Sequence, residues 1–339
     1  MMLERVAVIV LNWNGKEDTL GCLETVLGND HDNYFVIVSD NGSTDGSVEA
    51  VRKRYPQVVV VENGVNLGFA AGNNTGIEVA MAEGADVVVL LNNDTTVAHD
   101  WLTKMSSAAA ALTPGSVLGA KIFYWNDPDR IWHFGFRWNR KKCRYVALGR
   151  GQFDEGLAEI LAVDIVVGCC MWIPRTALDK VGLLEPDFFL NYEETDWCCR
   201  AVRAGIQIYS VPDAHVWHKI SASFIGRPHH DYFMFRNRLL WLERNFSGMD
   251  HVYRYFRMAF RSHMKVRRKL IWQLVQYHAY NFIGRTPPHR LLHQISQCRA
   301  ALRGVQDYYG RRFGNCPQDV LDLLPVAQDG DRVNKCNAE

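Results

Sequence analysis

Four short apolar runs alternate with helical patterns in the first 125 residues. Strands are expected at 5–11, 34–39, 57–61 and 86–94, and helices at about 16–27, 48–54 and 66–83. Parallel strands need crossover connections, and such crossovers are almost always right-handed. The order of elements therefore predicts an α/β fold whose central sheet is mostly parallel, with helices on both faces.

A polar cluster follows the most apolar of these strands. The run of Val and Leu at 87–91 leads directly into Asn92, Asn93 and Asp94. Open α/β sheets bind ligands beyond the carboxyl ends of their strands, so Asp94 is placed to hold a divalent cation and, through it, a phosphate. Asn and Asp also cap turns and helices, so this cluster by itself allows either interpretation.

The other strand ends carry similar clusters, and together they indicate a nucleotide pocket. Asp40 ends the second strand, where its carboxylate can accept the imide N–H of a pyrimidine base without separating uracil from thymine. Gly68 and Gly72 open the third helix and would let the backbone approach a phosphate. The chain has neither the dinucleotide-binding glycine pattern at this point nor a P-loop.

Composition narrows the class of protein further. The formal net charge of the 339 residues is +1, which gives no reason to expect nucleic acid as a partner. No run of 18 apolar residues is present, and the N-terminus lacks the long apolar core of a signal peptide. Nine cysteines without metal-knuckle spacing are most simply read as reduced thiols, so we expect a cytoplasmic protein.

The clusters occur in the order of a known family. Residues 8–15, 39–45, 66–74 and 91–94 resemble family 2 glycosyltransferases, with the rhamnosyltransferase-like and galactofuranosyltransferase-like enzymes as the closest subgroup. The resemblance covers about 4–245 and extends weakly to about 315. It implies a GT-A catalytic domain over 1–228, divided near 125 into a nucleotide-binding and an acceptor half. A helical extension would follow over 229–315, and 316–339 would be a flexible tail.

The resemblance also implies a set of site residues. Those for the nucleotide sugar are Leu11, Asn12, Asn14, Asp40, Gly42, Asn66, Gly68, Phe69, Asn73, Asn92, Asn93 and Gly168. A divalent cation, Mn²⁺ or Mg²⁺, would be held by Asp94 and by His218, which matches the last His of a family motif. His215 in the same motif is expected to be a packing residue. Carboxylate, imidazole and diphosphate oxygens suit these cations better than a closed zinc site.

The segment 188–200 resembles the catalytic segment of the family, in which an acidic pair opens a helix. The candidates for the catalytic base are Glu194, Glu193 and Asp196. The family usually has Glu-Asp at the pair and uses the second residue as base, whereas this chain has Glu-Glu. Glu194 would act with one extra methylene, so Glu193 or Asp196 could reach the acceptor instead. Carboxylates also stabilise a helix N-terminus, which is the purely structural alternative.

The function implied is that of an inverting, metal-dependent glycosyltransferase. It would move a sugar from a UDP- or dTDP-sugar, with dTDP-rhamnose slightly favoured, to a hydroxyl of a glycan or lipid-linked acceptor in cell-surface polysaccharide or glycoconjugate synthesis. Two rival classes remain, a nucleotidyltransferase that makes nucleotide sugars and a non-catalytic nucleotide-binding protein. The first would be expected to carry a basic triphosphate loop after its first strand, and 12–15 contains none.

Two further segments have an open role. In 127–160, four aromatic residues alternate with other residues from Trp132 to Trp138 as in a strand, and 149–156 is glycine-rich. We expect 149–156 to be either a mobile loop over the donor or acceptor, or an ordinary surface hairpin. Between Arg236 and Lys269, ten Lys or Arg stand against two acids on a helical pattern. This stretch either lies on an anionic membrane surface, at the inner face of the membrane, or packs on the catalytic domain.

Overall fold

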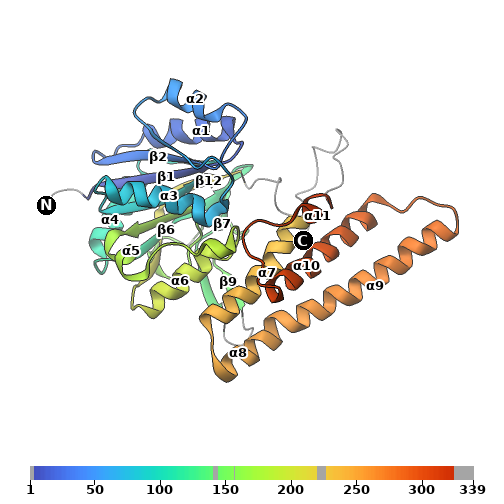
Figure 1. The fold of residues 1–339 in the computed structure, drawn as a ribbon. Helices are drawn as coiled ribbons and strands as arrows, with labels where there is room; N and C mark the ends of the chain where they lie inside the picture. The colour runs from blue at the N-terminus through green and yellow to red at the C-terminus, as the bar shows by residue number, and fades with distance from the viewer. Residues whose placement is uncertain (1–3, 140–143, 156, 220–226, 324–339) are drawn as a thin grey trace.

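The computed structural model describes residues 4–139, 144–155, 157–219 and 227–323 (Figure 1). The strands are β1 (Val6–Asn12), β2 (Tyr34–Asp40), β3 (Val59–Glu62), β4 (Val87–Asn92), β5 (Thr95–Val97), β6 (Val117–Tyr124), β7 (Asp127–His133), β8 (Phe136–Asn139), β9 (Arg144–Ala147), β10 (Leu161–Ala162), β11 (Cys170–Pro174) and β12 (Ile208–His218). The helices are α1 (Lys16–Leu27), α2 (Ser47–Arg54), α3 (Gly68–Ala82), α4 (Trp101–Ala111), α5 (Arg175–Val181), η1 (Pro186–Phe188), α6 (Glu193–Arg203), α7 (Pro228–Asn245), α8 (Gly248–Arg254), the π-helical segment η2 (Tyr255–Phe260), α9 (Arg261–Phe282), α10 (His289–Tyr309) and α11 (Gln318–Leu321).

The central sheet has the order β10-β12-β6-β11-β4-β1-β2-β3 in the described parts of the chain. The four strands of the nucleotide-binding half, β1 to β4, are parallel to their neighbours within that half. β11 inserts antiparallel between β4 and β6, and β12 returns parallel to β6. The predicted fold class, a mostly parallel α/β sheet followed by helices, is therefore confirmed.

Successive residues of the buried strands point to opposite faces of this sheet, and each face has its own helices. Val6, Val8 and Val10 of β1 pack with α1, α2 and α4 on one face. Ala7 and Ile9 pack with α3, α5 and α6 on the other. Both faces are covered, which explains why the strands read as continuous apolar runs rather than as alternating patterns.

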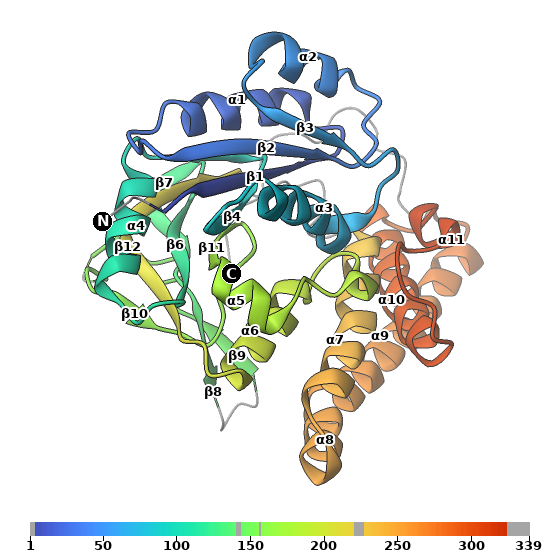
Figure 2. The same cartoon turned by 60° about the vertical axis from the view of Figure 1, so that its left-hand side comes forward.

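The chain after β12 forms a helical arm. α7 and α10 lie against each other beside the catalytic segment, and α9 extends away from the sheet and returns through α10 (Figures 1 and 2). The close approach of α7 and α10 depends on Gly304, where a Cβ atom would lie 2.3 Å from the carbonyl oxygen of Tyr232. A side chain at this position would push the two helices apart.

The described parts of the segment 127–160, whose role the sequence left open, pack on the body of the protein. The aromatic alternation is interrupted at Gly135, which has a φ of +84° and separates β7 from β8. The glycine-rich segment lies against β7, since Gly151 N–H donates to the Ile131 carbonyl and Ile131 N–H to the Gln152 carbonyl. The start of the expected tail is packed, with Cys316 and Val320 buried, whereas 324–339 and Gly156 lie outside the described residues.

Candidate active site

The polar strand ends meet at one edge of the sheet. Asn12 at the end of β1 lies opposite Asp40 at the end of β2, and Leu11 lies opposite Asn92 of β4. This register follows from parallel pairing, which puts the carboxyl ends of neighbouring strands side by side. The predicted nucleotide residues of three strands are therefore adjacent in space.

Asn12 is the centre of this edge. It is 1% exposed, and its Nδ2 donates to Asp40 Oδ1 over 2.7 Å and to Ser47 Oγ over 2.8 Å. Its Oδ1 accepts from Thr19 Oγ1 over 2.8 Å and from Asn93 Nδ2 over 3.3 Å. Asn12 thus fixes the ends of β1, β2 and β4 relative to one another.

Hydrogen bonds from two nearby residues hold the Asp40 carboxylate. Its side chain accepts from Asn12 through Oδ1 and from the Ser43 backbone N–H, 2.9 Å away, through Oδ2. The residue is only 2% exposed. Each carboxylate oxygen can accept two hydrogen bonds, so capacity for a further donor remains. The first role of Asp40 in this structure is to order the loop between β2 and α2.

The start of α3 is joined to the loop before α6. The Phe69 and Ala70 N–H groups donate to the Phe189 carbonyl, over 2.6 and 3.4 Å. Gly68 has a φ of +79°, and a Cβ there would lie 2.5 Å from the same carbonyl oxygen. The helix start that was expected to face a phosphate therefore binds the loop before α6 with two of its first N–H groups.

The other predicted donor residues occupy several environments. Asn14 has a φ of +48° and accepts from Thr44 N–H. Asn66 accepts from Gly68 N–H, and Asn73 is buried and donates to the Phe69 carbonyl within α3. Gly42 has a φ of +70°, and a Cβ there would lie 2.8 Å from the Gly64 carbonyl. These contacts shape the loops, and Asn73 lies within the fold rather than at its surface.

Asp94 and His218 lie together at the ends of β4 and β12. His218 Nε2 is 3.0 Å from Asp94 Oδ1, and their side chains are 8% and 13% exposed. The pairing of β12 with β5 creates this contact, because it sets His218 opposite Thr95. Two atoms bound in neighbouring positions to one ion at about 2.1 Å are themselves about 3 Å apart, so the pair fits a shared cation.

The chemistry of this pair also fits an open metal site. In the described parts of the chain, no group of three or more His, Cys, Asp or Glu side chains is gathered for a metal. Two protein ligands would leave most positions of a hard cation to phosphate oxygens and water. His215, by contrast, packs its ring against Phe123 at 5.1 Å, and its Nε2 lies 3.0 Å from the Pro212 carbonyl. His215 therefore has the surroundings of a packing residue.

Glu193, which is buried, and Glu194, which is half-buried, form a carboxyl pair at the start of α6. Burial, together with the neighbouring Glu194, raises the pKa of Glu193 well above its ordinary value, and burial also raises the pKa of Glu194. The Oε2 atom of each residue is buried without a hydrogen-bond partner in the described structure. A Cβ on Gly168 would lie 3.9 Å from Glu194 Cβ and 2.9 Å from the Phe69 ring. The pair thus lies beside two predicted donor residues.

The backbone before this pair is strained. Phe189, Asn191 and Tyr192 have φ values of +62°, +68° and +79°, which is unusual for side chains other than Gly and Asn. Asn237 of α7 holds this segment, because its Nδ2 lies 2.8 Å from each of the carbonyl oxygens of Phe188, Leu190 and Asn191. Strain that the surroundings enforce is common at functional sites.

Asn237 and its neighbour Arg236 were not predicted as site residues. Both are fully buried, and Arg236 Nη2 adds a bond of 2.9 Å to the Phe188 carbonyl. In the sequence they belong to the basic stretch, where they are expected on a surface. No local pattern marks them, because Asn237 does not share the helical face of Phe235, Leu239 and Leu242 and periodicity alone gives no reason to expect its burial.

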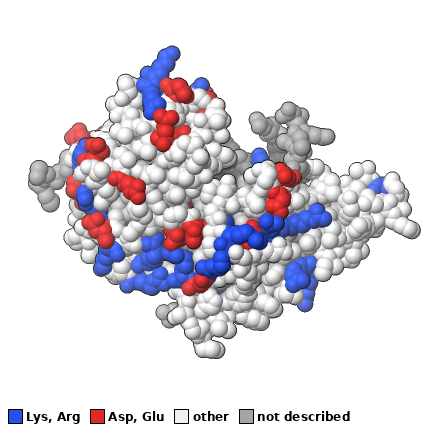
Figure 3. Space-filling model, viewed as in Figure 1, with Lys and Arg blue, Asp and Glu red and all other residues white. Residues whose placement is uncertain are grey.

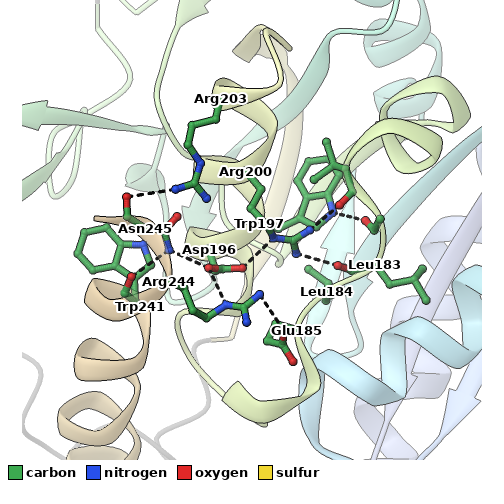
Figure 4. Close-up of polar contacts among 12 residues, drawn as sticks. Leu183, Leu184, Glu185, Asp196, Trp197, Arg200, Arg203, Trp241, Arg244 and Asn245 are labelled. Carbon is green, nitrogen blue, oxygen red and sulfur yellow. Dashed lines mark hydrogen bonds and ion pairs between the residues drawn. The ribbon is translucent and has the colours of Figure 1, made fainter. Parts of the chain in front are cut away.

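Asp196 lies in a different environment from the Glu pair (Figure 4). It is 0% exposed, and it accepts from Arg200 over 2.9 Å, from Asn245 over 2.8 Å and from Arg244 over 3.3 Å. Arg244 also pairs with Glu185 at 2.7 Å. This network joins α6 to α7, which favours a structural role for Asp196 over contact with an acceptor.

Comparison with known proteins agrees with this arrangement. The model of glycosyl transferase family 2 matches residues 7–182, more than half of the chain. This chain therefore belongs to glycosyl transferase family 2. The match covers the polar ends of β1, β2 and β4, as well as Gly168, and it ends before α6 and before His218 at the end of β12.

Two relatives are rhamnosyltransferases by name. The dTDP-rhamnosyl transferase RfbF of Shigella flexneri is 22% identical over 256 residues, which cover 72% of this chain and 82% of that protein. The N-acetylglucosaminyl-diphospho-decaprenol L-rhamnosyltransferase of Mycobacterium tuberculosis is 26% identical over 272 residues, covering 69% and 84%. The chain is thus similar to these enzymes at modest identity.

A solved structure shows the fold. The mannosyltransferase PcManGT from Pyrobaculum calidifontis, in complex with GDP-Man and Mn²⁺, has a TM-score of 0.56 and 15% identity. The alignment covers 92% of this chain and 89% of that one. The chain therefore has the GT-A fold of glycosyltransferases, as its motifs predicted.

Proposed function

We propose that this protein is an inverting glycosyltransferase that uses a UDP- or dTDP-sugar and a hydroxyl acceptor. The observation that carries the proposal is the Glu193–Glu194 pair beside Gly168, at the same edge of the sheet as the Asp94–His218 pair. Cys169 links the two, because its carbonyl accepts from Asn92 N–H over 3.0 Å. Two relatives named as rhamnosyltransferases make dTDP-rhamnose the first donor to test, with cell-surface glycan synthesis as the setting.

In the proposed reaction, Glu194 takes the proton from the acceptor hydroxyl as that oxygen attacks the anomeric carbon. The bond from the anomeric carbon to the diphosphate oxygen breaks, and its electron pair leaves with the nucleoside diphosphate. A raised pKa makes Glu194 the stronger base once it is ionised. Because the two carboxyl groups are neighbours and burial raises the pKa of each, one of them can keep a proton while the other accepts one.

Asp94 and His218 would hold the divalent cation, Mn²⁺ or Mg²⁺, which when bound supplies positive charge to the departing diphosphate. Asp40 remains the candidate for the imide N–H of the base, with Asn12 holding its carboxylate in place. The ring of Phe69 and the backbone at Gly168 would bound the donor sugar.

Donor identity is tested by thermal stabilisation with a panel of nucleotide sugars in the presence of Mn²⁺. A ligand that binds only the folded protein raises the midpoint of unfolding. We expect stabilisation by a UDP- or dTDP-sugar and release of the nucleoside diphosphate during turnover. Formation of pyrophosphate instead would identify a nucleotidyltransferase, and binding without any turnover would identify a non-catalytic protein.

The catalytic base is tested by Glu194→Gln, which keeps the shape of the side chain and removes the basic carboxylate. General-base catalysis contributes roughly 10²–10⁴-fold, so we expect turnover to fall by that factor while donor affinity is nearly unchanged. Glu193→Gln should be milder. Turnover and donor affinity are measured for both variants under identical conditions.

Asp196→Asn is the matched comparison in the same helix. Breaking a buried ion pair costs up to about 3–5 kcal/mol, so this variant should lose thermal stability while its folded fraction keeps its turnover. An inactive but stable Asp196→Asn protein beside an active Glu194→Gln protein would move the base to Asp196. Three fully active variants would overturn the mechanism.

A further inference from the structure

The helical arm exposes a continuous apolar stripe. α8, η2 and α9 form one uninterrupted helical rod from Gly248 to Phe282, about 50 Å long at 1.5 Å per residue. Nine of its large apolar side chains are 40–92% exposed. The exposed members are Met249, Val252, Tyr253, Phe256, Phe260, Ile271, Trp272, Val275 and Phe282.

Most of these residues share one face of the rod. Positions 249, 253, 256, 260, 271, 275 and 282 are separated by multiples of about 3.6 residues, which is the period of a helix. We call these seven residues the outer stripe. Apolar residues on the surface of a soluble protein are ordinarily scattered, so seven of them along one helical face mark an interaction surface.

The opposite side of the rod is already occupied. Ala259 and Gln273 are buried, and Gln273 Nε2 donates to Gln294 of α10 over 3.1 Å. Arg238 of α7 donates to the Met258 carbonyl and to Ser262 Oγ, each over 3.1 Å, where the π-helical turn alters the helix. The rod is therefore anchored through its inner side, and the outer stripe faces away from these contacts.

Apart from Asp250, which pairs with Arg254 over 2.8 Å, the Asp, Glu, Lys and Arg residues of the rod are all basic. Between Asp250 and Asp307 the sequence contains no Asp or Glu. Eleven Lys or Arg lie in this interval: 254, 257, 261, 265, 267, 268, 269, 285, 290, 299 and 303. Six of those on the rod, 257, 261, 265, 267, 268 and 269, are exposed. Figure 3 shows Lys and Arg side chains along the lower part of the molecule, including the arm that α9 forms.

We propose that the outer stripe lies flat on the anionic surface of a lipid bilayer. Apolar side chains on one face with flanking Lys and Arg are the composition of a helix that binds in the membrane interface. A second copy of this chain is a poorer partner, because pairing two such rods would bring their positive charges together. No helix in the described parts of the chain is long and apolar enough to cross a bilayer.

This proposal goes beyond the proposed function and is tested without turnover. Vesicles of equal parts phosphatidylcholine and phosphatidylglycerol are floated with the full-length protein at low salt. We expect co-flotation that high salt weakens, and little flotation with vesicles of phosphatidylcholine alone. Glu194→Gln should float as the unmodified protein does, so failure of the catalytic proposal and failure of this one are distinguishable.

Two sets of surface variants locate the contact. The apolar set is Phe256→Ser, Ile271→Ser and Val275→Ser combined, and the basic set is Arg261→Gln, Lys265→Gln and Arg268→Gln combined. Near an anionic surface each basic residue contributes about fivefold in affinity, so removing three should weaken vesicle binding roughly 100-fold. The apolar set should weaken vesicle binding by the same factor at low and at high salt.

The matched control replaces three exposed basic residues of the catalytic lobe, Lys53→Gln, Arg175→Gln and Lys180→Gln. It removes the same net charge from the protein and should leave vesicle binding unchanged. If the control lost as much vesicle binding as the basic set, the attraction would depend on overall charge, and the assignment of the contact to the rod would be overturned. Vesicle binding that is unchanged in both the apolar and the basic set would overturn it as well. So would a dimer in solution that only the apolar set dissociates.

Discussion

At the scale of the residue, partners decide what each acidic side chain can do. Glu194 and Asp196 are two positions apart on α6, and both are candidates for the base in the sequence. Asp196 accepts from three donors, Arg200, Arg244 and Asn245, whereas Glu194 Oε2 has no partner in the described structure. A carboxylate held by three donors stabilises the fold, whereas the Glu194 oxygen has no protein partner among the described residues to compete with a substrate, which agrees with its proposed role as base.

The Asp94–His218 pair, proposed to hold the cation, gives a prediction in which His215 serves as the control. Asp94→Ala should abolish metal-dependent donor binding while the fold survives, because Asp94 lies at a strand end. His218→Ala should raise the Mn²⁺ concentration needed for half-maximal activity. His215→Ala should not, since His215 packs against Phe123 and Trp217. Calorimetric titration of Mn²⁺ and donor measures all three, and equal effects of the two His variants would point to packing rather than ligation.

The raised pKa of Glu193 predicts how stability depends on pH. Below the ordinary value of 4.5 the residue is protonated in both the folded and the unfolded protein. As the pH rises above 4.5 the unfolded protein loses the proton first, so stability falls until the folded pKa is passed. Glu193→Gln cannot ionise and should escape this loss.

Thermal unfolding of Glu193→Gln and the unmodified protein across a pH series checks this expectation. The two midpoints should be similar below pH 4.5, and that of the variant should become the higher one as the pH rises. A difference in midpoint that does not change with pH would show that packing, rather than ionisation, distinguishes the two proteins.

At the scale of the element, α7 supports the turn that precedes the proposed catalytic pair. Three carbonyl groups of the strained turn before α6 accept hydrogen bonds from Asn237, and Asp196 joins the following helix to Arg244 and Asn245 of α7. The helix after the sheet is therefore part of the site's scaffold. The arm begins with a structural helix and continues into the exposed rod.

Asn237→Ala should separate positioning from binding. Leaving buried carbonyls without donors costs on the order of 1–3 kcal/mol, so the unfolding midpoint should fall modestly. Because the strained turn loses its support, kcat should fall much more than donor affinity. The exposed Asn281→Ala is the control and should change neither quantity. A donor affinity that falls as much as kcat would indicate general loosening of the fold.

At the scale of the whole molecule, the residues proposed for catalysis and for the cation come from distant parts of the chain. The Phe189 carbonyl accepts from the first N–H groups of α3, and Asn237 holds the same turn from α7. His218 reaches Asp94 across 124 residues through β12 and β5. The turn at Phe189 to Asn191 thereby joins α3, the Glu pair and α7.

The sequence by itself determined the alternation of strands and helices along the first half, the polar strand ends and the family. These depend on local patterns, such as β-branched runs and the Asn-Asn-Asp that follows Leu91, which remain visible without neighbours. The pairing of Asp94 with His218 was also predictable, although only because both residues lie in motifs of the family.

Only the tertiary structure decided which polar residues belong to the scaffold. Asn73, Arg236 and Asn237 have the composition of surface or site residues, yet each is buried and bonded to the backbone of the protein. Likewise the basic stretch divides into Arg236, Arg238 and Arg244, which bind within the fold, and the exposed cations of α9. Burial depends on contacts between distant segments, and those contacts leave no periodic signal in the sequence.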